Sequence, residues 1–182
     1  PGANFSIDTS HKDISHWSIN HASYDTLVFI FAAGTTGIND DFEYLHFIKD
    51  HHKDNCRLVF VFNKLDEYKD SEDSIDDSIN KINEDLKNIG FDSYELYPVS
   101  ASAGTMAKDV IQGVSFPPTS PEYFQYLGIK AHFNSPNFDC SKFYNVPKDH
   151  IDLVKQSLSK NPEEFALLLK SGMLGLEYIL TH

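Results

Sequence analysis

The chain of 182 residues is 41% hydrophobic and 13% aromatic, enough apolar material for one packed domain with an appended helical region. It carries 15 Lys and Arg against 27 Asp and Glu, so its formal net charge of -12 should repel nucleic acid and anionic lipid headgroups. Neither is expected as a direct partner. The two cysteines suggest neither a disulfide framework nor a metal site, and no apolar run approaches the roughly 18–20 residues of a membrane span, so the cytoplasm is the expected compartment.

The hydrophobic pattern of the first half alternates between strands and helices. Connections of the length seen here join parallel strands through helical crossovers, so the sequence predicts an α/β fold with a parallel sheet. Apolar runs predict strands at residues 26–33, 58–62 and 94–99, and helical spacing predicts helices within residues 11–24, from Asn39 onward, and from Ser74 to Gly90.

The second half is expected to be mainly helical. Residues 116–121 form a proline-rich break, after which Ser120 and Pro121 have the composition of a helix start. A loop is expected over residues 134–147, and further helices over residues 151–158, 162–170 and 174–181.

The segment after the second predicted strand, Asn63-Lys64-Leu65-Asp66, has the chemistry of a guanine-reading loop. Ligands of open α/β sheets bind beyond the carboxyl ends of the strands, where this segment lies. The Asp66 carboxylate can accept two hydrogen bonds, from the N1–H and the exocyclic amine of guanine, and adenine offers no such pair of donors on that edge. Asn63 is expected to bond the base edge and brace neighbouring loops, with the methylene stem of Lys64 along the base face.

A second loop of this kind follows the third predicted strand, at Ser100, Ala101 and Ser102. The small side chains allow the backbone to approach a base closely. A backbone N–H can then meet the O6 of guanine, a contact that the amine of adenine would repel. Two such loops in this order, joined by a helix, are a far more specific sequence signal of guanine recognition than either loop alone.

Residues 1–102 resemble the second half of a GTPase domain, and their details are similar to bacterial dynamin-like GTPases. Pro1-Gly2 matches the end of the Asp-x-Pro-Gly switch motif, and residues 37–41, Gly-Ile-Asn-Asp-Asp, match that group as well. Residues 171–177, Ser-Gly-Met-Leu-Gly-Leu-Glu, are similar to the start of the last helix of such domains. The resemblance implies an incomplete P-loop GTPase-like three-layer sandwich that binds GTP or GDP with Mg²⁺, the Gly2 N–H meeting the γ-phosphate.

The phosphate-binding loop of such enzymes is absent from these 182 residues, because no segment fits G-x-x-x-x-G-K-[ST]. The Asp that precedes Pro-Gly in the switch motif is absent too. We therefore expect a piece of a longer GTPase whose upstream part supplies a strand, the phosphate loop and the first switch. The chain alone is expected to be inactive, and any membrane association would belong to other parts of the parent.

No catalytic residue and no metal ligand is assigned within the chain. Arg57, its only arginine, starts a strand away from the nucleotide end and makes a poor arginine finger. The activating residue is expected from upstream or from a partner GTPase domain. The histidines and acidic residues lack the spacing of a metal site.

The resemblance divides the chain into three parts. Residues 1–104 would be the C-terminal part of the GTPase domain, from the second switch to the Ser-Ala loop. A mostly helical insertion would follow over residues 105–159, and residues 160–182 would be the closing helices of the same domain.

Two other hypotheses remain open from the residues alone. The chain could be a non-catalytic α/β module that binds a protein partner through its helical insertion, with Asn-Lys-Leu-Asp as a mere turn. It could also be another nucleotide-binding α/β protein, such as a flavodoxin-like domain. A phosphate loop upstream of residue 1 would support the GTPase hypothesis, and its absence would support the interaction module.

Overall fold

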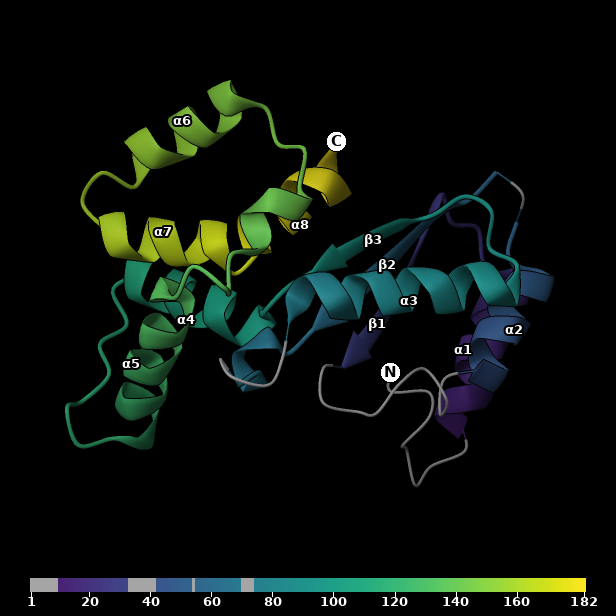
Figure 1. The fold of residues 1–182 in the computed structure, drawn as a ribbon, viewed down its shortest axis with the longest axis horizontal. Helices are drawn as coiled ribbons and strands as arrows, with labels where there is room; N and C mark the ends of the chain where they lie inside the picture. Colours follow the sequence, from purple (N-terminus) through teal and green to yellow (C-terminus); the bar gives the residue numbers. More distant parts are fainter. Residues whose placement is uncertain (1–9, 33–41, 54, 70–73) are drawn as a thin grey trace.

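The computed structural model describes residues 10–32, 42–53, 55–69 and 74–182. In the described residues, strands and helices alternate as far as residue 98, and helices follow from residue 101 onward (Figure 1). The helices are α1 (Ser10–His21), α2 (Phe42–His51), α3 (Ile75–Ile89), α4 (Ala101–Ile111), α5 (Pro121–Asn134), α6 (Lys148–Ser157), α7 (Pro162–Lys170) and α8 (Met173–Thr181). The strands are β1 (Thr26–Ala32), β2 (Arg57–Asn63) and β3 (Glu95–Pro98), and two short 3-10 helices are η2 (Leu65–Glu67) and η3 (Cys140–Phe143).

The three strands form one parallel sheet in the order β1-β2-β3, as the sequence predicts. Its register pairs Thr26 with Arg57 at one end and Phe62 with Pro98 at the other. Residues 58–62 of β2 are each at most 6% exposed. Their unbroken apolar run thus belongs to a strand that is covered on both faces.

Helices pack on both faces of this sheet. On one face, the aromatic side chains of β1 and β2 join a large core with α2 and α3, and Figure 1 shows α3 lying along the sheet. On the other face, Val59, Val61 and Val99 form a smaller cluster under Met173 and Leu176, both from α8. The fold is therefore a layered α/β arrangement.

Helix α3 shows how local sequence sets an element in this fold. The Ser74 hydroxyl accepts a hydrogen bond from the Asp77 N–H at 3.2 Å and caps the first turn. Gly90 ends the helix with a left-handed φ of 102°. Its buried face carries the predicted residues Ile75, Ile79, Ile82, Leu86 and Ile89.

The second half differs from the prediction in three places. The segment from Ser100 to Ser102 is not a loop, because Ser100 caps α4 and the next two residues form its first turn. Helix α5 extends to Asn134, and η3 interrupts the predicted loop. Helix α4 also runs through the predicted boundary between residues 104 and 105, and the division into three parts stays a prediction.

In the part of the chain that the structure describes, no helix combines the length and apolar character needed to cross a membrane.

Candidate functional site

The two predicted base-reading segments meet at the carboxyl edge of the sheet. The register places Phe62 beside Pro98, and the Val99 N–H donates to the Phe62 carbonyl at 2.8 Å. Asn63 and Ser100, the residues that follow, therefore leave the sheet side by side. This adjacency follows from the parallel pairing of β2 and β3.

Asn63 ties these two segments together. Its Oδ1 accepts one hydrogen bond from the Lys64 N–H at 2.7 Å and another from the Ala101 N–H at 3.0 Å. Lys64 has a left-handed backbone with φ 70°, which costs free energy for a residue with a side chain. The exposed Lys64 ammonium lies 3.3 Å from Glu67. Asn63 therefore joins the two segments by hydrogen bonds. Because the Ala101 N–H already donates to Asn63, it does not serve as a donor to a base.

Asp66 lies in η2 and accepts a hydrogen bond from the Ser100 hydroxyl. The Ser100 Oγ donates to Asp66 Oδ1 at 2.5 Å and accepts from the Ala103 N–H at 3.1 Å. Ser100 is fully buried, so its hydroxyl has a fixed position and fixes the carboxylate in turn. Asp66 itself is only half-buried. The site thus presents an oriented carboxylate at the edge of the sheet.

Residues from the C-terminal half hydrogen-bond to the end of β3 and to the cap of α4. The buried Ser171 carbonyl accepts the Ser100 N–H at 2.9 Å, and the Tyr144 hydroxyl donates to the Pro98 carbonyl at 2.8 Å. Gly172 follows with a φ of 78° in close contact with that carbonyl. From the sequence, Ser171 and Gly172 were interpreted only as the start of the last helix. Tyr144 carries no sequence signal of this role.

Helix α5 supports the site from a second direction. The His132 Nε2–H donates to the Leu65 carbonyl in η2 at 2.9 Å, and Gln125 Nε2 approaches the hydroxyl of Ser102 at 3.4 Å. Ser102 is half-buried in the first turn of α4. Both predicted segments are thus in contact with α5, which sequence reasoning did not anticipate.

Three motifs of the resemblance cannot be compared with this site in full. Gly2, the predicted γ-phosphate contact, lies outside the described residues, and so does the Gly-Ile-Asn-Asp-Asp segment at residues 37–41. Within the third motif, residues 171–177, Glu177 of α8 forms an ion pair with Lys108 of α4.

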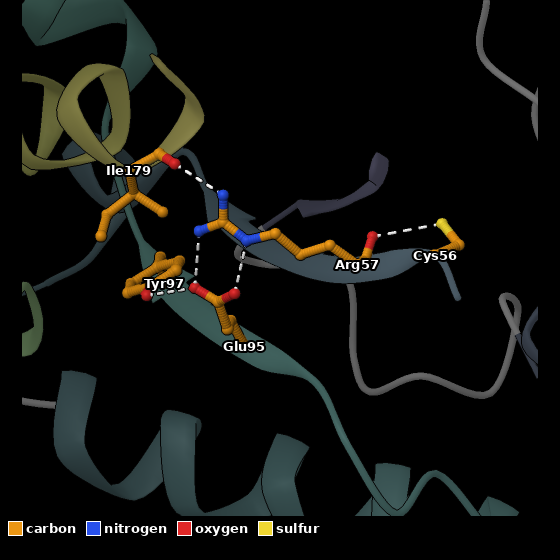
Figure 2. Close-up of polar contacts among 5 residues, drawn as sticks. All are labelled: Cys56, Arg57, Glu95, Tyr97 and Ile179. Carbon is orange, nitrogen blue, oxygen red and sulfur yellow. Dashed lines mark hydrogen bonds and ion pairs between the residues drawn. The ribbon is translucent and has the colours of Figure 1, made fainter. Parts of the chain in front are cut away.

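Arg57 lies at the other end of β2 and has a structural role there (Figure 2). Its guanidinium makes two hydrogen bonds to the Glu95 carboxylate, at 2.6 and 2.9 Å, and a third to the Ile179 carbonyl at 2.7 Å. The Tyr97 hydroxyl also donates to Glu95, at 2.6 Å. The Arg57 hydrogen bonds lower the pKa of Glu95 below its ordinary value, and burial together with Glu95 raises the pKa of Tyr97 to about 12. This cluster joins β2, β3 and α8.

The described residues contain no group of three or more His, Cys, Asp or Glu side chains placed to hold a metal ion. The carboxyl edge of the sheet presents one carboxylate, one side-chain amide and the N–H groups of the first turn of α4. No protein family model, no curated protein and no solved structure matches this chain.

Proposed function

We propose that this chain is the base-recognition part of a guanine-nucleotide-binding domain, within a GTPase of the dynamin-like type. The observation that carries the proposal is the pair of hydrogen bonds, Ala101 to Asn63 and Ser100 to Asp66, between the turn after β2 and the start of α4. They hold two segments with base-reading chemistry in one arrangement. Both segments lie where parallel sheets bind their ligands.

The proposed recognition uses the difference between the edges of guanine and adenine. A carboxylate that accepts one hydrogen bond from Ser100 keeps acceptor capacity for the N1–H and amine of guanine, so Asp66 would select that base. The Ser102 N–H, in the first turn of α4, has no acceptor within its own helix and would meet O6. The helix dipole at this end adds partial positive charge, which favours O6 over an amine.

The phosphates of the nucleotide and the Mg²⁺ ion would be held by an upstream part of the parent. Strand β1 supports this assignment because it lies at an edge of the sheet that the described strands form, yet has apolar side chains on both faces. Val28 and Ile30 are 40% and 60% exposed, although neighbouring Val59 and Val61 on β2 are covered. A further strand and helix would cover them. GTP hydrolysis belongs to that complete domain in this proposal.

The test is a titration of fluorescently labelled GDP and ADP into this chain and into a form extended upstream through the expected phosphate loop. The extended form should bind GDP and discriminate against ADP. Asp66→Asn should reduce that preference by about fivefold or more, since a mismatched polar group in a site costs about 1–3 kcal/mol. Glu67→Gln is the matched control, because it removes a neighbouring exposed carboxylate that contacts only Lys64 among the ion pairs described.

Equal binding of GDP and ADP by the extended form, or an unchanged preference in Asp66→Asn, would refute the guanine assignment. The alternative of a non-catalytic α/β interaction module would then be favoured by the exposed apolar side chains of α5, of which Phe124 is 62% exposed.

A further inference from the structure

Helix α5 contacts both base-reading segments from one side. The His132 Nε2–H donates to the Leu65 carbonyl in η2 at 2.9 Å, and Gln125 Nε2 lies 3.4 Å from the Ser102 Oγ in α4. Gln125 and His132 are about two helical turns apart, so they lie on the same side of α5. One helix from the C-terminal half therefore reaches the turn after β2 and the start of α4 together.

The hydrogen bond from His132 is the shorter of these two contacts, and its donor is held in place. A carbonyl oxygen only accepts hydrogen bonds, so Nε2 of the imidazole carries a proton. The ring stacks on Phe138 with the ring centroids 3.8 Å apart, and it lies edge-on to Phe133 at 5.1 Å. Both phenylalanines are 1% exposed. Two buried aromatic rings thus hold the His132 donor against η2.

The turn that carries Asp66 needs support from outside itself. Lys64, at its start, has a left-handed φ of 70°, and such a conformation persists only where the surrounding structure determines it. Element η2 is a single short turn with little hydrogen bonding of its own. The Leu65 side chain is fully buried, and its carbonyl accepts from the Tyr68 N–H at 3.3 Å as well as from His132. His132 therefore fixes the backbone directly before Asp66.

We infer that His132 is a positioning residue for base recognition, because it fixes η2 and thereby the direction in which the Asp66 carboxylate faces a base. The inference rests on the proposed guanine site. Ser100 holds one oxygen of that carboxylate, and His132 holds the backbone that carries it. Hydrogen bonds weaken steeply when they are misaligned, so a displaced Asp66 would lose its preference for guanine. Helix α5, within the predicted helical insertion, would then take part in setting base specificity.

Nucleotide affinities of the upstream-extended form test this role, with GDP, ADP and inosine diphosphate as probes. Inosine lacks the exocyclic amine of guanine, so the ratio of GDP to inosine diphosphate affinity reports the second hydrogen bond to Asp66. His132→Phe keeps a ring on Phe138 and removes the donor. It should reduce both the GDP/ADP and the GDP/inosine diphosphate ratio about threefold or more. His132→Met, a second variant without the donor, should behave in the same way.

Two further variants separate positioning from general effects of substitution. His132→Gln should retain most of the wild-type ratios, because its amide nitrogen can take the place of Nε2. His51→Phe is the matched control: His51 also stacks on a phenylalanine, Phe47, at 4.2 Å and bonds to a backbone carbonyl at 2.9 Å, but it ends α2 before β2 begins. It should leave both ratios unchanged. Partial unfolding lowers the binding of all three nucleotides alike, so it does not imitate the expected change in the ratios.

The route through Asp66 is tested by combining the substitutions. If His132 acts by positioning that carboxylate, adding His132→Phe to Asp66→Asn should reduce the GDP/ADP ratio no further. A further drop in the double variant, wild-type ratios in His132→Phe, or an equal drop in His51→Phe would each overturn the inference and leave the guanine site standing. A wild-type extended form that does not distinguish GDP from ADP would refute the proposed function, and this inference with it.

Discussion

At the residue scale, the candidate site depends on Gly172, a glycine remote from it in sequence. Its φ of 78° is one that residues with a Cβ rarely adopt. An added Cβ would lie 2.5 Å from the Pro98 carbonyl oxygen and 3.0 Å from the Tyr144 ring. The strand end that leads into Ser100 is therefore packed directly on this backbone.

We expect Gly172→Ala to lower the free energy of unfolding by about 2–4 kcal/mol, because backbone strain and overpacking add together. Urea denaturation followed by circular dichroism measures the change. Gly128→Ala is the matched control: it lies inside a helix with open space around it, and should stabilise the chain by up to about 1 kcal/mol. An unchanged urea midpoint for Gly172→Ala would show that the strand end can move away from α8.

At the element scale, segments whose apolar residues have helical or strand spacing were predictable from the sequence. Segments without such spacing were not. The buried face and both caps of α3 followed from its own residues. The start of α4 did not, because its small residues carry no apolar spacing and the cap at Ser100 looks like a loop. In the site, the nearness of Asn63 to Ala101 followed from parallel strand order. The contacts from Ser171 and Tyr144 depend on tertiary packing, which no local pattern encodes.

The contact between α5 and α7 contains a buried polar pair whose energetics can be measured. The Tyr126 hydroxyl donates to Glu164 Oε1 at 2.5 Å, and each residue is 8% exposed. We expect Tyr126→Phe to cost about 2–3 kcal/mol of stability, because it leaves a buried carboxylate without this donor. The double variant Tyr126→Phe/Glu164→Met should recover most of the loss, since both partners become apolar. A double-mutant cycle in urea measures the coupling, and strictly additive losses would contradict it.

The cluster of Arg57, Glu95 and Tyr97 should make the junction of β2, β3 and α8 sensitive to acid. The pKa of Glu95 is lower in the folded chain than in the unfolded one, owing mainly to its hydrogen bonds from Arg57. Its contribution to stability is therefore present above the unfolded pKa of about 4.3, and is lost as the pH falls through the folded pKa.

We accordingly expect Glu95→Gln to cost about 1–2 kcal/mol at neutral pH, an estimate reduced for solvent screening because both side chains are about a third exposed. The difference from wild type should shrink as the pH is lowered below the unfolded pKa of Glu95. Urea midpoints measured between neutral and acidic pH provide the test. Glu163→Gln, which removes a carboxylate from an exposed ion pair with Lys130, should show little change, and a cost for Glu95→Gln that does not vary with pH would refute the linkage.

At the scale of the whole molecule, β1 is the element whose sequence and surroundings disagree most. Its run Thr-Leu-Val-Phe-Ile-Phe-Ala is typical of a strand inside a sheet, yet the described strands pair with it on one side only. Long apolar edge strands are a risk for aggregation that proteins normally cover. Helix α8 covers Val59 and Val61 on the same face of the sheet but leaves Ile30 exposed. The proposed upstream strand and helix would complete that layer.

A comparison of this chain with its upstream-extended form tests whether the β1 face is covered in the parent. Ile30→Thr keeps a β-branched residue in the strand, so in this chain, where Ile30 is 60% exposed, the urea midpoint should hardly change. In the extended form the same substitution should cost about 1–3 kcal/mol, because an apolar side chain would be removed from a buried layer. Val61→Thr, at a position 2% exposed on that face, should cost a similar amount in both forms. If the extended form tolerated Ile30→Thr as well as this chain does, no added element would pack on β1, and the phosphate-binding unit would have to bind elsewhere.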